Sequence, residues 1–144
     1  MQVIRAMQDT DAQAVFAIDK ACFSDPWTAE MWQGELARAD IRCLVLEEDG
    51  QILGFALASV LFEDAELPKI AILPTHQKSG FGEKLLTALC EEVQRLGATK
   101  MFLEVRVNNV PARKLYERNG FEILRTRYKY YPDGEDALEM KKDL

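Results

Sequence analysis

The fold is decided by the stretch Leu73-Pro74-Thr75-His76-Gln77-Lys78-Ser79-Gly80-Phe81-Gly82-Glu83-Lys84. A strand-like apolar run precedes it, and from Gly80 onwards apolar residues recur at helical spacing. Glycines let backbone N–H groups turn toward a ligand, and a helix N-terminus adds partial positive charge. The stretch therefore predicts a strand, an anion-cradling loop and a helix, although an ordinary strand-to-helix turn explains two glycines equally well.

Two familiar phosphate loops are excluded. A P-loop needs Gly-Lys-Ser/Thr, which is missing. A dinucleotide fingerprint needs a third glycine, and Leu85 stands in its place. The anion is therefore neither a P-loop nucleotide nor a Rossmann dinucleotide.

The remaining helices are delimited by capping residues. Thr10, with Gln13 three residues on, predicts the start of a first helix, and Thr28 predicts the start of a second. Gly97 ends the helix that follows the loop, and Asn109 begins the last one. The expected strands are 2–6, 41–47, 51–62, 67–73, 100–105, 121–131 and 137–142, with hairpin turns at Asp49-Gly50 and Asp133-Gly134. The order β-α-α-β-β-β-α-β-α-β-β predicts an α+β, three-layer fold with a mixed, mostly antiparallel sheet and helices on both faces.

Length and composition restrict the class of protein. The chain has 144 residues, which predicts one domain spanning 1–144. A net charge of −6 argues against nucleic acid as a partner. No apolar run is long enough to span a membrane, and no secretory signal precedes the first strand, so we expect a cytoplasmic protein. Three widely spaced cysteines and the single His76 predict reduced thiols and no metal site.

Loop spacing, a second motif and element order together resemble one family. Gln77-Lys78-Ser79-Gly80-Phe81-Gly82 is similar to the Q/R-x-x-G-x-G/A pyrophosphate loop of the GNAT superfamily of acyl-CoA N-acyltransferases. Ala112-Arg113-Lys114-Leu115-Tyr116-Glu117-Arg118-Asn119-Gly120-Phe121 resembles its A-x-x-L-Y-x-x-x-G-F signature. The resemblance covers essentially the whole chain and implies the GNAT fold and acetyl-CoA. Leu73 departs from the pattern, since relatives commonly carry Asp there.

Three further segments resemble a subfamily, the N-terminal protein acetyltransferases of the bacterial RimI type. They are Phe23-Ser24-Asp25-Pro26-Trp27, the strand Leu103-Glu104-Val105-Arg106 and the segment Arg127 to Ala137 with Tyr130-Tyr131-Pro132. The resemblance implies acetylation of the N-terminal alanine of a small-subunit ribosomal protein by direct attack in a ternary complex. Acceptors that stay open are a lysine side chain and a small-molecule amine, and a third reading is a non-catalytic acetyl-CoA-binding module.

Acetyl transfer to an amine needs a neutral nucleophile and a proton for the leaving thiolate. A lysine is harder to deprotonate than an α-amino group by roughly 3.3–3.7 kcal/mol, so a modest base suits an N-terminal acceptor. Glu104 is the candidate base, and its alternative is a surface carboxylate paired with Arg106. The resemblance assigns Tyr116 as general acid, and the alternative is an aromatic anchor for its helix.

The resemblance also implies the binding residues. Residues expected to hold the acetyl-CoA arm and pyrophosphate are Ile70, Ala71, Ile72, Lys78, Ser79, Gly80, Phe81, Gly82, Glu83 and Asn109. A backbone N–H near Ile72 is the candidate oxyanion donor. Trp27, Tyr130 and Tyr131 are candidate walls of a slot for the acceptor peptide, with packing as their alternative. We expect a monomer whose partner is a protein N-terminus.

Overall fold

The computed structural model describes residues 1–144 and places seven strands in a single sheet. The strands are β1 (Gln2–Ala6), β2 (Ile41–Glu48), β3 (Gln51–Leu61), β4 (Asp64–Ile72), β5 (Lys100–Arg106), β6 (Glu122–Arg127) and β7 (Ala137–Asp143). The helices are α1 (Ala12–Cys22), α2 (Ala29–Leu36), α3 (Phe81–Arg95) and α4 (Val110–Arg118). Short 3-10 turns occupy Asp9–Asp11 and Pro74–His76.

The sheet order is β1-β2-β3-β4-β5-β7-β6, and every neighbouring pair is antiparallel except β4 and β5. Parallel neighbouring strands need a crossover connection, and the helix α3 forms it between β4 and β5. Element order and the mixed, mostly antiparallel sheet confirm the predicted fold.

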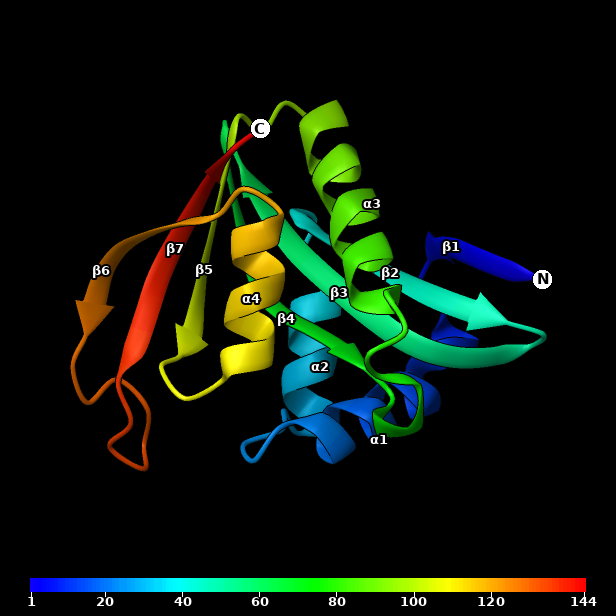
Figure 1. Cartoon of the computed structure of the whole chain (residues 1–144). Helices are drawn as coiled ribbons and strands as arrows, with labels where there is room; N and C mark the ends of the chain where they lie inside the picture. Colours follow the sequence, from blue (N-terminus) through cyan, green and yellow to red (C-terminus); the bar gives the residue numbers. More distant parts are fainter.

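Helices cover both faces of the sheet (Figure 1). Alternation along β3 sends Phe55 and Leu57 into a core with α1 and α2, and sends Ala56 and Ala58 into a core with α3 and α4. Trp32 of α2 is fully buried and stacks edge-on against Phe55. Both cores are apolar layers between a helix pair and the sheet, which is the three-layer arrangement that the periodicity predicts.

The parallel strands β4 and β5 are paired along only part of their length. Their pairing ends at Leu67 and Leu103, and the strand ends diverge beyond that point (Figure 1). On its other side β4 carries a bulge, because Leu57 pairs with Lys69 whereas Ser59 pairs with Glu66. Pro68, which has no N–H to donate, lies in this bulge. We call the region where β4 after Leu67 and β5 after Leu103 are no longer paired the wedge.

Several local predictions are confirmed and two are wrong. Thr28 caps α2 by accepting from Met31 N–H at 3.1 Å, and Asn109 caps α4. Thr10 does not cap α1: the Asp11 carboxylate accepts from Gln8 N–H at 2.8 Å and begins this segment. The strand expected over 121–131 ends at Arg127, and residues 128–136 form a loop.

Candidate active site

The loop between β4 and α3 presents a row of backbone donors without partners. None of the N–H groups from Lys78 to Glu83 donates a hydrogen bond within the chain. Gly80 has a φ of +83° and Lys78 a φ of +63°. Left-handed residues in such a loop gather successive N–H groups into a concave anion site, which the N-terminus of α3 reinforces. The donors therefore lie where the sequence predicts a pyrophosphate cradle.

Gln77 attaches this loop to the end of β4. Its Nε2 donates to the Ile72 carbonyl oxygen at 3.0 Å. The Cys22 thiol of α1 donates to the same oxygen at 3.1 Å. Gly82 lies under α4, where a Cβ would stand 3.4 Å from Leu115 Cδ2. Gly80 therefore supplies the left-handed turn, whereas at Gly82 an added Cβ would make an ordinary van der Waals contact with Leu115.

Backbone groups of Ile70 and Ile72 point into the wedge between β4 and β5. Leu73 N–H donates to the Leu53 carbonyl at 2.7 Å, and Ala71 is opposite Phe55. Because hydrogen-bonded and non-bonded residues alternate in an antiparallel pair, Ile70 and Ile72 direct their N–H groups away from β3. These two N–H groups are therefore not used by β3 and can donate to an extended chain that lies along β4.

A groove of about 500 Å³ opens on the α2 side of the sheet, where β4 and β5 separate. Trp27, Pro68 and Glu104 line it, together with Arg127 and Glu139. Its other carboxylates are Glu35, Asp64 and Glu66, and its other arginine is Arg38. Carboxylates outnumber guanidiniums, so the groove favours a cationic or amine-bearing ligand.

Glu104 lies in this groove on β5, with its side chain 31% exposed. Arg106 is not its partner, contrary to the alternative considered from the sequence. Arg106 instead pairs with Asp133 at 2.8 Å and with Glu135 at 2.9 Å. The charged neighbour of Glu104 is Arg127 of β6, whose Nε lies 3.5 Å from Oε1. Glu104 is thus accessible from the groove and forms no salt bridge with a residue of its own strand.

Tyr116 lies on α4 and is buried, with its ring edge-on to Phe121 at 5.6 Å between centroids. Its hydroxyl makes no hydrogen bond within the chain, and the hydroxyl oxygen is not completely shielded from solvent. Burial raises the pKa of this phenol, and Tyr131 raises it further. A phenol in this state keeps its proton at neutral pH.

Asn109 holds the start of the same helix. Its side-chain oxygen accepts from Ala112 N–H at 3.3 Å, and the residue is exposed. The amide NH2 group makes no hydrogen bond within the chain.

Both candidate tyrosines lie in the loop between β6 and β7, not on a strand. Tyr131 stacks on Arg106, with the guanidinium carbon 4.0 Å from the ring centroid. Burial raises the pKa of Tyr131 to about 12, and Glu104 contributes in the same direction. Tyr131 thus lies near enough to both Tyr116 and Glu104 to interact electrostatically with each.

A buried ion pair next to Trp27 of the groove is not predicted from the sequence. Lys69 of β4 donates to Asp19 Oδ1 of α1 at 2.6 Å, and both side chains are almost completely buried. Oδ2 of Asp19 accepts from Trp27 N–H at 3.0 Å and from Trp32 Nε1 at 2.9 Å. One carboxylate thereby sets the position of Trp27 at the groove. The sequence does hold a signal for this pair, because Asp19 and Lys69 are charged residues within otherwise apolar stripes of α1 and β4.

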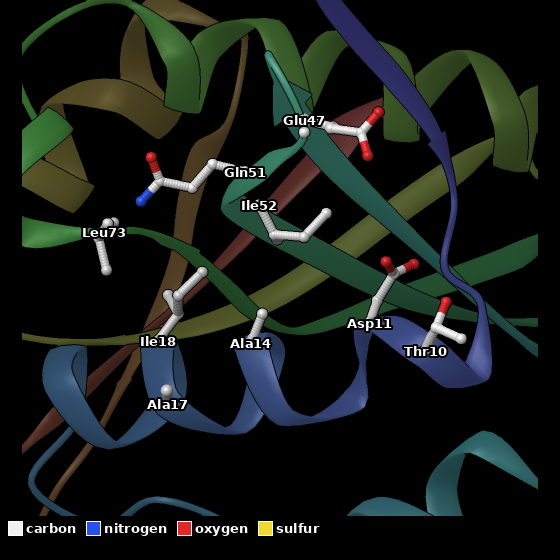
Figure 2. A pocket seen from close by; sticks show the side chains of 10 residues that line it. Thr10, Asp11, Ala14, Ala17, Ile18, Glu47, Gln51, Ile52 and Leu73 are labelled. Atoms are coloured by element: carbon white, nitrogen blue, oxygen red, sulfur yellow. The ribbon is translucent and has the colours of Figure 1, made fainter.

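A second hollow of about 430 Å³ lies between α1 and the β2–β3 turn. Figure 2 shows small side chains of α1, Ala14 and Ala17, on one side of it and Glu47 and Gln51 on another. It contains neither Glu104 nor Tyr116, and only Leu73 connects it to the anion loop. The candidate reaction therefore belongs to the first groove.

Comparison with known proteins decides the family. The family model described as Acetyltransferase (GNAT) family matches residues 12–121. The chain belongs to the GNAT acetyltransferase family. This GNAT protein is 33% identical over 143 residues to the [Ribosomal protein bS18]-alanine N-acetyltransferase of Escherichia coli, covering 97% of this chain and 96% of the relative. The Haemophilus influenzae enzyme of the same name is 35% identical over 139 residues, with 96% and 94% covered.

Solved structures agree. The crystal structure of the ribosomal-protein-S18-alanine N-acetyltransferase from Escherichia coli superposes with a TM-score of 0.92 at 32% identity, covering 99% of this GNAT chain and 94% of that one. The family is that of acetyl-CoA-dependent N-acetyltransferases. None of the four helices is both long and apolar enough to cross a membrane.

Proposed function

We propose that the chain transfers an acetyl group from acetyl-CoA to the α-amino group of a protein N-terminus, with the N-terminal alanine of ribosomal protein bS18 as acceptor. The observation that best supports the proposal is the placement of three groups around β4. Unpaired N–H groups of residues 78–83 follow this strand, Ile70 and Ile72 direct their N–H groups away from β3, and Glu104 lines the groove where β4 and β5 separate. The names of the relatives support the acceptor.

The chain's residues fit acetyl-CoA by their chemistry. The N–H groups of Lys78, Ser79, Gly80, Phe81, Gly82 and Glu83 match an anionic pyrophosphate. The backbone of Ile70, Ala71 and Ile72, with the free amide of Asn109, matches an amide-bearing arm. When bound, acetyl-CoA supplies the thioester that is attacked.

Glu104 takes the proton of the acceptor amine through a water molecule, and Tyr116 donates a proton to the departing thiolate. The N–H of Ile72 stabilises the oxyanion. Trp27, Tyr130 and Tyr131 form the walls around the acceptor peptide. Transfer is direct, with no acetyl-enzyme: burial raises the pKa of each of the three thiols, which makes them poor nucleophiles.

The proposal extends to the setting of the enzyme. Residues 1–144 act as one acetyltransferase domain and as a monomer in the cytoplasm. The partner is a ribosomal protein, with no nucleic acid, membrane or metal involved in the reaction.

A peptide panel tests the function. One peptide begins with Ala and carries an internal Lys, a second has the same sequence with its α-amine formylated, and others begin with Ser or Met. We expect mass spectrometry to find acetyl on the α-amine of the Ala peptide and none on the formylated one. Acetyl-lysine in the formylated peptide would make the chain a lysine acetyltransferase. Tight acetyl-CoA binding without turnover on any peptide would make it a binding module.

A further inference from the structure

Two carboxylates face each other directly in the groove. Glu104 of β5 pairs with Glu139 of β7 in the antiparallel register, and both side chains line the groove. Directly opposed like charges repel each other across a strand pair. Something must therefore offset the charge of this pair if Glu104 is to be available as a base.

Arg127 lies between the two carboxylates. Its terminal nitrogen bonds to Glu139 Oε2 at 2.9 Å, and its Nε lies 3.5 Å from Glu104 Oε1. That Nε is sealed from solvent and has no hydrogen-bond partner. A buried donor without a hydrogen-bond partner is unfavourable. The ion-pair partner of this Nε is the Glu104 carboxylate. Arg127 is thus anchored on one glutamate and poised beside the other.

Arg125 provides a natural comparison within the same strand. It also bonds to Glu139, through Nε at 3.0 Å to Oε1. It is 60% exposed and forms no ion pair with Glu104. The two arginines therefore share an anchor, and only Arg127 reaches the candidate base.

Other charged and titratable groups surround Glu104 from each neighbouring element. Tyr130 lies close enough that the Glu104 carboxylate raises the pKa of its phenol. The Tyr130 ring also lies over the Arg127 guanidinium, with 5.7 Å between the guanidinium carbon and the ring centroid. The remaining groups are Asp64 and Glu66 from β4, Glu35 from α2, Arg38 from the turn after α2, Glu139 from β7 and Tyr131 from the β6–β7 loop. Arg38 is already bound to Glu35 and Asp40, so Arg127 is the cation available to Glu104.

We propose that Arg127 is a positioning residue that fixes Glu104, offsets the Glu104–Glu139 repulsion and keeps the acceptor amine neutral in the groove. The inference rests on the proposed base role of Glu104. Without Arg127, an α-ammonium entering the groove would pair with a Glu104 carboxylate that no other cation offsets, and it would become harder to deprotonate, whereas Glu139 would keep Arg125. The Arg127 cation occupies that position and disfavours a second positive charge, which lowers the pKa of the bound amine.

Arg127→Gln tests this role, with Arg125→Gln as the matched control. We expect the acid limb of the kcat profile of R127Q to move up by about 0.5–1 pH unit, because one cation near the amine is lost at a partly exposed site. At pH 7 kcat then falls about three- to tenfold. The peptide KM stays constant or decreases, since the ammonium binds more tightly, and the acetyl-CoA KM is unchanged. R127K restores the limb, and R125Q behaves as the wild type.

Two outcomes separate this inference from the proposed function. If R127Q and R125Q share one pH limb, or if R127Q raises both KM values without moving the limb, Arg127 has a structural role only and the inference is wrong. If Glu104→Gln keeps the wild-type kcat and limb, Glu104 is not the base, and the proposed mechanism itself fails. Thermal unfolding of each variant in the presence of acetyl-CoA verifies that the compared proteins are folded.

Discussion

Lys69→Met should strongly destabilise the fold. The substitution leaves the Asp19 carboxylate, which is 0% exposed, without its only cation. Two N–H donors from Trp27 and Trp32 remain on Oδ2, but Oδ1 loses its partner. Breaking a buried ion pair from one side costs about 3–5 kcal/mol, because an uncompensated charge stays in the interior. The loss is a large fraction of the roughly 5–15 kcal/mol that stabilises a typical domain.

The expected change in melting temperature follows from chain length. For 144 residues, an unfolding entropy of about 2.1 cal/mol/K per residue converts this loss into a decrease of about 10–16 °C. Urea unfolding at pH 7, followed by tryptophan fluorescence, measures the free energy directly because Trp27 and Trp32 both adjoin the pair. A loss below about 1 kcal/mol would refute the reasoning, because exposed ion pairs contribute that much.

A double variant makes the test sharper. Asn in place of Asp19 can still accept from Trp27 and Trp32 through its side-chain oxygen, and it carries no charge. Lys69→Met with Asp19→Asn should therefore be more stable than Lys69→Met alone, by about half of the loss. Equal stability of the two variants would show that lost packing around Lys69, and not a stranded carboxylate, causes the effect.

Three further predictions concern the site. Tyr116→Phe should lower kcat about 10²–10⁴-fold with an unchanged Tm, since the hydroxyl has no partner in the chain; a rate within threefold of wild type, on the order of experimental scatter, would exclude it as the acid. Gly80→Ala should cost about 1–2 kcal/mol and raise the acetyl-CoA KM, because φ is +83°; calorimetry and steady-state kinetics measure both. Burial raises the pKa of Cys43 to about 12, so a thiol reagent at pH 8 should label the half-buried Cys22 first, as peptide mapping would show, and early labelling of Cys43 would contradict this order.

Much of the fold follows from local signals. Some features depend on only one or two residues and can therefore be predicted from the sequence. They are the cap at Thr28, the turn at Asp49-Gly50 and the helix end at Gly97. Asp49 and Gly50 both adopt positive φ, as a tight hairpin turn requires. Elements defined in this way appear close to where they were expected.

Tertiary contacts account for the differences. Residues 128–131 have strand-like composition, but Lys129 takes a φ of +51° and its N–H donates to Asp136 at 2.8 Å. Arg106 then holds this loop through Asp133 and Glu135, which turns both tyrosines toward arginines. The start of α1 likewise shifts because Arg5 of β1 binds Asp11 at 2.7 Å. Neither anchor is detectable from sequence spacing.

The candidate site divides in the same way. The unpaired backbone N–H groups of residues 78–83 depend on a contiguous motif, so the loop itself can be predicted from the sequence. The neighbours of Glu104 come from β6 and β7, and they could not be assigned before the order β5-β7-β6 was known. Asp19 and Lys69 lie 50 residues apart, so their pairing is a property of the folded chain alone.

Acetylation of a protein α-amino group by this chain can be observed in cells. The most direct measurement is mass spectrometry of intact bS18 from a strain that lacks the gene, complemented either with the wild-type chain or with Glu104→Gln. We expect N-terminally acetylated bS18 with the wild-type chain and a free N-terminal alanine without it, with little restoration by Glu104→Gln. Fully acetylated bS18 in the deletion strain, or acetyl on lysines alone after complementation, would contradict it.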